Sequence, residues 1–236
     1  MEKTALVTGG ARGIGAGIVR SLAGDGWQVF INYHTSESQA LALAAETGGI
    51  AIKADVRDFA SVSDMFQKTG PVDLLVNNAG IAYYGVITST TIMKWRELFS
   101  VNVDGVFHCT QCALPEMIMR KKGNIINISS VWGMVGASCE TAYSAAKSAV
   151  IGFSKALAKE LGPSSIRVNC ITPGVVGTDM IGNLSEDDLN AIKAETPLGR
   201  LGNPEDIGSL VAYLASPGAG FITGQVISPN GGFVIA

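Results

Sequence analysis

Short apolar runs alternate with longer amphipathic stretches along the whole chain. The short runs have the length and composition of buried strands, and in the longer stretches apolar residues recur every three or four positions, as on one face of a helix. The runs that predict strands are residues 3–8, 28–32, 50–54, 73–76, 124–129, 166–171 and 225–228. The stretches that predict helices are residues 16–23, 36–46, 59–68, 91–120, 143–161 and 204–214. This alternation predicts an α/β fold with about seven parallel strands and helices on both faces of the sheet.

No linker or change in composition divides the chain, so we expect a single domain over residues 1–236. The segment 178–197 is more polar and predicts two short helices inserted on the substrate side of the sheet. A Rossmann-type, doubly wound sheet binds its ligands beyond the carboxyl ends of the strands. Unusual sequences follow the predicted strands at that edge, namely residues 9–15, Asp55, residues 77–80, Ser129, Ser130, Pro173 and Gly174.

The composition favours a globular, mildly acidic protein. Apolar residues make up 47% of the chain and charged residues 16%, and the formal net charge is −3. No basic run is longer than the three residues at 120–122, so neither nucleic acid nor an anionic membrane is expected as a partner. Every apolar stretch ends well before the ~20 residues of a membrane helix, and the chain opens on a strand without signal-peptide features. We therefore expect a cytoplasmic protein.

The cysteines and histidines predict neither a disulfide framework nor a metal site. Four cysteines are too few and too scattered for such a framework, which agrees with a reducing compartment. Cys109 and Cys112 have the C-x-x-C spacing, but they lie in an apolar helical stretch and are interpreted as small buried side chains. With His34 and His108 as the only histidines, no metal cluster is predicted.

A tyrosine and a lysine stand four residues apart on the predicted helix 143–161. The spacing places the Tyr143 phenol and the Lys147 ammonium on one face, where the positive charge is expected to lower the pKa of the phenol. A free tyrosine titrates near pH ~10, so a lowered pKa would make it a usable acid or base in a neutral cell. The alternative is a chance pair on a helix surface. Further motifs in the chain are needed to distinguish a proton-transfer pair from a chance pair.

The turn after the first strand contains glycines spaced G-x-x-x-G-x-G, at Gly9, Gly13 and Gly15. Glycines permit a tight turn and let a diphosphate approach the backbone at the amino end of the next helix. Together with N-N-A-G at 77–80, a serine and Y-x-x-x-K, this turn resembles the fingerprint of the short-chain dehydrogenase/reductase family. The resemblance extends to P-G-x-x-x-T at 173–178 and to G-Q-V-I-S-P-N-G-G near the end. It covers essentially the whole chain and implies an NAD(P)-dependent oxidoreductase.

The resemblance assigns roles to residues at matching positions. Tyr143 is implied as the proton donor to a ketone, Ser130 as a second hydrogen-bond donor, and Lys147 as a ligand of the nicotinamide ribose. Asn102 is implied in a water relay that resupplies the proton through the lysine, and an asparagine is unusual inside a helix. Ser129 is expected to turn into the strand end. The other cofactor-binding residues implied are Gly9, Gly13, Ile14, Gly15, Asp55, Val56, Asn78, Ala79, Gly80, Pro173, Gly174, Val176 and Thr178.

The end of the second strand bears on the choice between NAD and NADP, because an acidic residue there would bind the ribose hydroxyls and repel a 2′-phosphate. Asn32, Tyr33 and His34 occupy this position, without a carboxylate. Arg12 in the glycine turn can face the same pocket, and a guanidinium suits a phosphate, although a solvated loop cation is the alternative. We therefore predict NADP(H) in preference to NAD(H), with these four residues as candidate contacts.

Two substrate classes are compatible with the motifs. T-G-G-A-R-G-I-G, P-L-G-R-L-G and I-T-G-Q-V-I resemble the 3-oxoacyl-acyl-carrier-protein reductase branch, which implies a small-molecule or carrier-linked carbonyl and makes residues 120–122 possible docking cations. The segment 132–140 is similar instead to reductases of the 5-aminopentanone modification of bacterial elongation factor P, in which case Glu140 would pair with a substrate ammonium. A carboxylate that interacts with the helix dipole is the alternative for Glu140.

The resemblance also bears on assembly and on activity itself. The family usually forms homotetramers by packing two long helices, which here carry residues 101–119 and 143–161. A catalytically silent dinucleotide-binding sensor or scaffold is the alternative of another class. Such a silent protein would be expected to have lost Ser130, Tyr143 or Lys147, and all three are present here.

Overall fold

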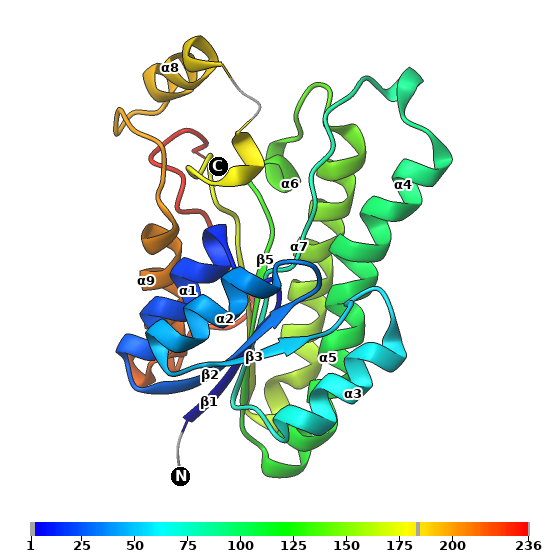
Figure 1. The fold of residues 1–236 in the computed structure, drawn as a ribbon, viewed down its shortest axis with the longest axis vertical. Coiled ribbons are helices and arrows are strands. Elements are labelled where there is room, and N and C mark those ends of the chain that lie inside the picture. The colour runs from blue at the N-terminus through cyan, green and yellow to red at the C-terminus, as the bar shows by residue number, and fades with distance from the viewer. Residues whose placement is uncertain (1–2, 183–184, 236) are drawn as a thin grey trace.

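Seven parallel strands form one sheet in the computed structural model, which describes residues 3–182 and 185–235 (Figure 1). The strands are β1 (Lys3–Val7), β2 (Trp27–Tyr33), β3 (Ile50–Lys53), β4 (Leu74–Asn77), β5 (Gly123–Ile128), β6 (Ile166–Ile171) and β7 (Val226–Ile227). Their order across the sheet is β3-β2-β1-β4-β5-β6-β7. The chain changes direction across the sheet between β1 and β4, and doubly wound sheets bind their ligands in a crevice at this point, beyond the carboxyl ends of the strands. The predicted fold class is confirmed.

Helices cover both faces of this sheet (Figure 1). They are α1 (Gly13–Gly24), α2 (Glu37–Thr47), α3 (Phe59–Thr69), α4 (Ile92–Phe99), α5 (Gly105–Arg120), α6 (Trp132–Val135), α7 (Thr141–Leu161), α8 (Glu186–Glu195) and α9 (Pro204–Ala215). The helices α1, α2 and α9 pack on one face, and α3, α5 and α7 pack on the other. Both layers leave the carboxyl ends of the strands accessible to the loops that follow them.

Alternation along the strands divides the core into two layers. In β1, Ala5 and Val7 belong to the layer under α1 and α9, whereas Leu6 between them belongs to the layer under α3, α5 and α7. All three side chains are fully buried, as expected of a strand covered on both faces. Burial of one leucine side chain contributes about 1.5–3 kcal/mol, so the apolar runs of the sequence stabilise both layers at once.

The predicted helix 91–120 is one continuous helical stretch with an irregular middle. A π-helical segment, Ser100–Asp104, joins α4 to α5 and contains the buried Asn102. The wider turn shifts the faces of the helix locally, which apolar spacing does not reveal. The single turn of α6 was also not predicted. The segment 178–197 does contain two short helices, a 3₁₀ turn at Asp179–Ile181 and α8, and its residues 183–184 lie outside the described residues.

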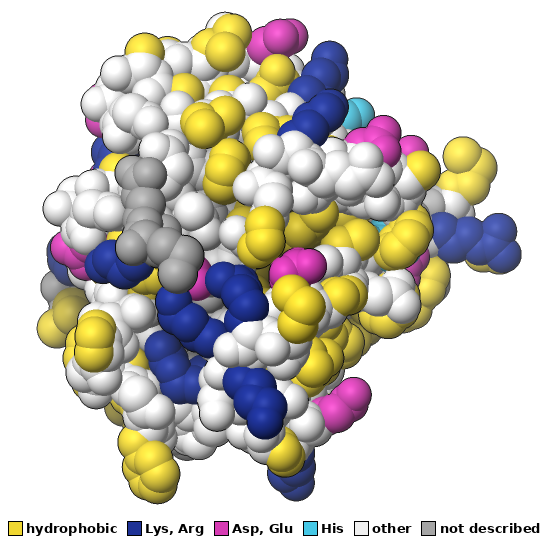
Figure 2. Space-filling view, turned by 90° about the horizontal axis from the view of Figure 1, so that it is seen from below, with side chains coloured by type: hydrophobic (Ala, Val, Ile, Leu, Met, Phe, Trp, Pro, Cys, Tyr) yellow, Lys and Arg dark blue, Asp and Glu magenta, His cyan; other side chains and the backbone are white. Residues whose placement is uncertain are grey.

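Basic side chains gather on the face seen in Figure 2, which lies below the sheet of Figure 1. Arg120 at the end of α5 and Lys122 just after it each form an ion pair with Asp73 at 3.0 Å. These residues precede β5 and β4, so they lie at the amino ends of the strands. The cations at 120–122, considered above for docking, are therefore at the opposite edge of the sheet from the crevice.

Within residues 3–182 and 185–235, no helix has the length and apolar character needed to cross a membrane, and no group of three or more His, Cys, Asp or Glu residues could hold a metal ion. Cys109 is fully buried, Cys112 is partly buried, and both thiols are free. Burial raises the pKa of each thiol, which agrees with the interpretation of this C-x-x-C pair as apolar packing.

Candidate active site

The turn between β1 and α1 forms one wall of the crevice. Gly9 and Gly13 have positive φ angles of 58° and 53°, a conformation that glycine adopts without strain. Arg12 is the N-cap residue of α1, and its side chain does not cap the first N–H groups of the helix. Ile14, in the first turn of α1, is partly buried and packs against the core. Uncapped N–H groups at the positive end of the helix dipole fit the diphosphate of a dinucleotide.

The loop after β4 is fastened to this turn by side-chain hydrogen bonds. The Thr8 hydroxyl accepts from the N–H groups of Asn78 and Ala79, each at 3.0 Å. The Asn78 amide donates to the carbonyls of Thr8 and Gly9, also at 3.0 Å. Because β1 and β4 are neighbours at the point where the strand order reverses, these bonds fix both loops relative to each other at the mouth of the crevice.

Two residues that were predicted to select the cofactor have their side chains bonded elsewhere. Asn32 is buried, its Oδ1 accepts from the N–H of Gly9 at 3.2 Å, and its Nδ2 donates to the Ala54 carbonyl at 3.1 Å. Tyr33 is buried in the layer under α1 and α2, and its hydroxyl donates to Glu37 Oε1 at 3.3 Å. Both side chains therefore make hydrogen bonds within the fold at the end of β2, and their contact with a 2′-phosphate stays a prediction.

Two exposed side chains at this end of the crevice, Arg12 and His34, each lie near a carboxylate. The Arg12 side chain is 62% exposed and lies 3.7 Å from Asp179, and the His34 side chain is 51% exposed and lies 3.7 Å from Asp55. Asp55 accepts hydrogen bonds from the Arg57 guanidinium at 2.6–3.0 Å, and these bonds lower the pKa of the carboxyl. The sequence prediction missed Arg57. Its position two residues after Asp55, just beyond a strand, was the available signal.

Val56 and Thr178 lie at opposite sides of the predicted cofactor path. Val56 is buried, and His108 Nδ1 hydrogen-bonds its carbonyl oxygen at 2.9 Å. Thr178 follows β6, and its methyl group would be 3.3 Å from a Cβ placed on Gly13. Thr178 is therefore next to the glycine turn.

The loop after β6 closes the crevice below α8. The Pro173 carbonyl accepts from the N–H of Val131 at 3.0 Å, which ties this loop to the end of β5. Gly174 packs tightly on Asn230, and Val176 is buried. A cavity of about 240 Å³ borders the loop, and its lining residues come from 174–175, 196–206 and 229–231. Of the predicted contacts in this loop, Gly174 lines the cavity.

Tyr143 and Lys147 of α7 meet Ser130 at the carboxyl end of β5. All three side chains are buried. Lys147 Nζ donates to the Ile128 carbonyl at 3.0 Å and lies 5.7 Å from the centroid of the Tyr143 ring. The Ser130 hydroxyl accepts from the N–H of Trp132 at 3.2 Å and lies close to the phenol. The structure thus brings together the three residues that the spacing singled out.

Burial decides the ionisation of both groups on α7. It raises the pKa of Tyr143 to about 12, against the opposite effect of Ser130 and with a smaller contribution from Glu140. It lowers the pKa of Lys147 to about 8. The expected lowering of the pKa of Tyr143 is therefore not found in this structure, because the effect of removal from water outweighs that of Ser130. Tyr143 is a protonated acid at neutral pH, and Lys147 is mostly charged.

Asn102 holds the backbone beside the catalytic candidates. Its amide donates to the carbonyls of Ile81 and Leu98 at 2.9 and 3.0 Å, and its Oδ1 accepts from the N–H of Ile81 at 3.2 Å. A Cβ on Gly80 would lie 2.7 Å from Asn102 Oδ1 and 3.3 Å from Lys147 Nζ, so only a glycine fits there. The π-helical turn brings Asn102 to this position, which is consistent with π-turns at functional sites.

Glu140 stands at the rim of the site as the N-cap residue of α7. Its carboxyl is partly buried, which raises its pKa, and no Lys, Arg or His of the described residues forms an ion pair with it. Its side chain does not cap the helix by a hydrogen bond. This rim therefore presents a carboxylate without a cation.

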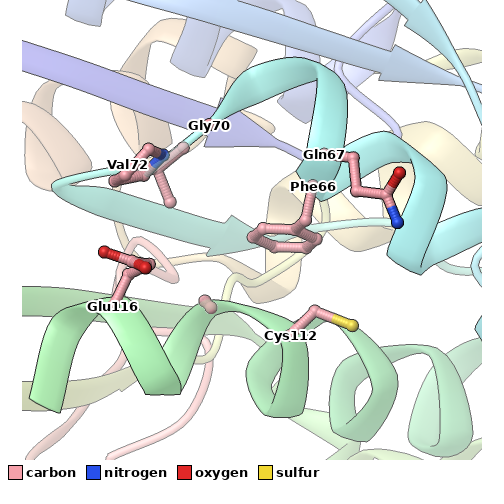
Figure 3. Close-up of a pocket in the computed structure, with 8 residues that line it drawn as sticks. Phe66, Gln67, Gly70, Val72, Cys112 and Glu116 are labelled. Atoms are coloured by element: carbon pink, nitrogen blue, oxygen red, sulfur yellow. The ribbon is translucent and has the colours of Figure 1, made fainter. Parts of the chain in front are cut away.

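A separate hollow of about 200 Å³ lies between α3 and α5 (Figure 3). The side chains of Phe66 and Gln67 line it from α3, those of Cys112 and Glu116 line it from α5, and Val72 closes one side. Val72 precedes β4, so the hollow is near the amino ends of the strands. It is not part of the site around Tyr143.

Comparison with known proteins finds similar proteins over nearly the whole chain. The family model described as Enoyl-(Acyl carrier protein) reductase matches residues 9–234. Acetoacetyl-CoA reductase of Rhizobium meliloti (strain 1021) is 43% identical over 237 residues, and 3-oxoacyl-acyl-carrier-protein reductase FabG of Staphylococcus aureus (strain N315) is 40% identical over 241 residues, each with 98% of both chains covered. Uncharacterized oxidoreductase YmfI of Bacillus subtilis (strain 168) is 38% identical over 240 residues, with 99% of both chains covered.

Proposed function

Because the chain belongs to the short-chain dehydrogenase/reductase family, as the family model and relatives at 40–43% identity show, we propose that it is an NADPH-dependent reductase that converts a ketone to a secondary alcohol. Its substrate class in this proposal is a 3-oxoacyl group carried on acyl-carrier protein or coenzyme A. The observation that supports the activity is the buried cluster of Ser130, Tyr143 and Lys147, next to Gly80 and the glycine turn.

When bound beside Tyr143 and Lys147, a nicotinamide cofactor would supply the hydride for the carbonyl carbon. Negative charge then builds on the carbonyl oxygen, where a proton and a second hydrogen bond are needed. Tyr143 is protonated at neutral pH and donates its proton to that oxygen, and Ser130 donates a hydrogen bond to it. Lys147 stabilises the phenolate that remains on Tyr143. Resupply of the proton through Lys147 and water near Asn102 stays a prediction.

The charges at the adenosine end support the preference for NADPH. No residue at the end of β2 has a carboxylate, and the nearby Asp55 is neutralised by two-point contact with Arg57. Arg12 and His34 are exposed at this end, and Arg57 adds a further guanidinium. A 2′-phosphate can therefore accept hydrogen bonds from the guanidinium groups of Arg12 and Arg57, whereas a 2′-hydroxyl finds no free carboxylate there to accept its hydrogen bond.

Arg12→Ala is expected to lower kcat/KM with NADPH about tenfold while changing the value with NADH less than about twofold, because only NADPH offers a phosphate to the guanidinium. Initial rates at limiting cofactor, together with dissociation constants from fluorescence titration, measure both effects. Arg20→Ala is the matched control, since Arg20 lies exposed on the same helix and pairs with Glu46 at 2.7 Å. A wild-type enzyme that uses NADH more efficiently than NADPH would overturn the assignment.

A second candidate function is favoured by Glu140. Its partly buried carboxylate forms no ion pair with the described residues and lies at the rim near Tyr143, where a cationic substrate would find a partner. An amino ketone such as the 5-aminopentanone modification of elongation factor P has the required ammonium. If the substrate is instead a 3-oxoacyl group on acyl-carrier protein or coenzyme A, Glu140 has no assigned partner.

The two substrate classes separate in one assay of acetoacetyl-CoA against an amino ketone, each with NADPH. For the acyl substrate we expect turnover that Glu140→Gln alters less than about threefold. If the amino ketone is the substrate, Glu140→Gln should lower its kcat/KM by about 10–100-fold, because a charge-assisted hydrogen bond is worth about 1.5–3 kcal/mol. Glu160→Gln, on the exposed side of the same helix, is the control. Cofactor binding without turnover of either ketone, or of a broad carbonyl panel, would instead support the silent sensor or scaffold.

The homotetramer also remains part of the proposal. Helix α5 exposes Phe107, Ile118 and Met119, and helix α7 exposes Gly152 with no atom within 4 Å of a Cβ placed on it. Both helices thus present surface that a second copy of the chain can cover. The cytoplasmic location stays a prediction.

A further inference from the structure

Ser129 points away from the substrate side, toward α7. Its hydroxyl donates to the backbone carbonyl of Lys147 at 2.8 Å, and the residue is only 4% exposed. The N–H of Ser129 donates to the Ile171 carbonyl at 2.7 Å, which fixes its backbone to β6. Neighbouring residues at the end of β5 therefore face opposite ways, with Ser130 toward Tyr143 and Ser129 toward the peptide of Lys147.

The end of β5 contacts Lys147 at two points, its ammonium and its backbone carbonyl. The Ile128 carbonyl accepts from Lys147 Nζ at 3.0 Å, and the Ser129 hydroxyl donates to the Lys147 carbonyl. Gly133 lies close to both residues. A Cβ on it would be 2.8 Å from the carbonyl carbon of Lys147 and 2.9 Å from Ser129 Oγ. The lysine is thus fixed against one rigid strand end.

We propose that Ser129 is a positioning residue, which sets the distance between the Lys147 ammonium and the Tyr143 phenol. The proposal rests on the proposed function, in which the charge of Lys147 stabilises the phenolate. Charge stabilisation falls with distance, and small displacements at a reacting centre cost much of the rate. Without the Ser129 bond, the hydrogen bond that remains between Lys147 and the end of β5 is made by the ammonium at the far end of a long side chain.

Ser129→Ala tests this role, with Ser148→Ala as the matched control. The Ser148 hydroxyl donates to the Gly133 carbonyl at 2.7 Å, so it makes the same kind of bond between α7 and the chain after β5 without touching Lys147. In Ser129→Ala we expect kcat for ketone reduction to fall about tenfold with KM for the ketone within about twofold. In Ser148→Ala we expect kcat within about threefold of the wild type.

The pH profile separates positioning from a loss of folding. In the reverse reaction, the alcohol gives its hydride to the oxidised nicotinamide and its proton to the Tyr143 phenolate. A displaced ammonium stabilises that phenolate less, so the limb on which oxidation rises with pH should move about half a unit or more to higher pH in Ser129→Ala. The limb should stay at its wild-type position in Ser148→Ala. Thermal unfolding by circular dichroism establishes the folded fraction of each variant.

If Ser129→Ala does not fold, Ser129→Cys keeps the volume and weakens the donor, and the same shift of the limb is expected. A Ser129 variant whose pH limb coincides with the wild type, or a Ser148→Ala variant with the same shift, contradicts the positioning role. Failure of the proposed function gives a different result, because the wild-type protein itself would then show no ketone reduction.

Discussion

Tyr143→Phe is expected to lower kcat for ketone reduction at least about a thousandfold, while the dissociation constant of NADPH changes less than about threefold. The phenol is the only group in the proposed mechanism that gives a proton to the carbonyl oxygen, and general acid catalysis contributes about 10²–10⁴ in rate. Phenylalanine keeps the ring, which packs with Leu98 and Ala142. Loss of NADPH absorbance measures the rate, and quenching of tryptophan fluorescence measures binding.

Tyr213→Phe controls for removal of a tyrosine hydroxyl, because Tyr213 is half-exposed on α9 and lies outside the proposed site. Its kcat should match that of the wild type. Turnover by Tyr143→Phe within tenfold of the wild type would remove Tyr143 from the mechanism. Loss of NADPH binding in the same variant would show that the residue supports the cofactor site rather than proton transfer.

The sheet and its helices could be predicted because both depend on apolar periodicity. The run at 3–8 predicts a strand covered on both faces, and Ala5, Leu6 and Val7 do divide between two core layers. The π-turn at Asn102 could not be predicted in the same way, since a single wider turn leaves the apolar spacing on either side nearly unchanged. Only the presence of an asparagine inside a helix marked the place.

The site was predictable in its residues but not in its electrostatics. The spacing of Tyr143 and Lys147 places them on one face of α7, and they do lie together. How far each is removed from water depends on β5, α4 and the loops that pack over α7, which the spacing does not contain. The raised pKa of Tyr143 and the lowered pKa of Lys147 both follow from that burial.

Side-chain direction at the end of β2 was the second feature of the site that could not be predicted from the sequence. Position along the chain brings Asn32, Tyr33 and His34 to the crevice, but the pleat of the strand and the neighbouring turn decide which side chain is free. Asn32 and Tyr33 are used within the fold, and His34 just beyond the strand is exposed. Arg57 was missed because it is identified by its contact with Asp55 rather than by a family motif.

Gly15→Ala is expected to destabilise the folded protein by at least about 3 kcal/mol and to abolish measurable NADPH binding. A Cβ on Gly15 would lie 2.2 Å from the Gly9 carbonyl oxygen, 2.7 Å from Asn78 Nδ2 and 2.9 Å from Gly10 Cα. Two of these atoms are backbone and the third is hydrogen-bonded, so none can move aside without opening the glycine turn. Urea unfolding measures the free energy of unfolding, and fluorescence titration measures binding.

Gly24→Ala is the matched control for this change, because Gly24 belongs to the same helix and a Cβ there meets no atom within 4 Å. Alanine has the higher helix propensity, so Gly24→Ala should raise the free energy of unfolding by about 0.5–1 kcal/mol and leave NADPH binding unchanged. The opposite signs of the two results separate steric exclusion at the turn from the general effect of replacing a glycine. A Gly15→Ala variant as stable as the wild type, with NADPH still bound, would mean that the turn can open by several tenths of an ångström without losing the diphosphate site.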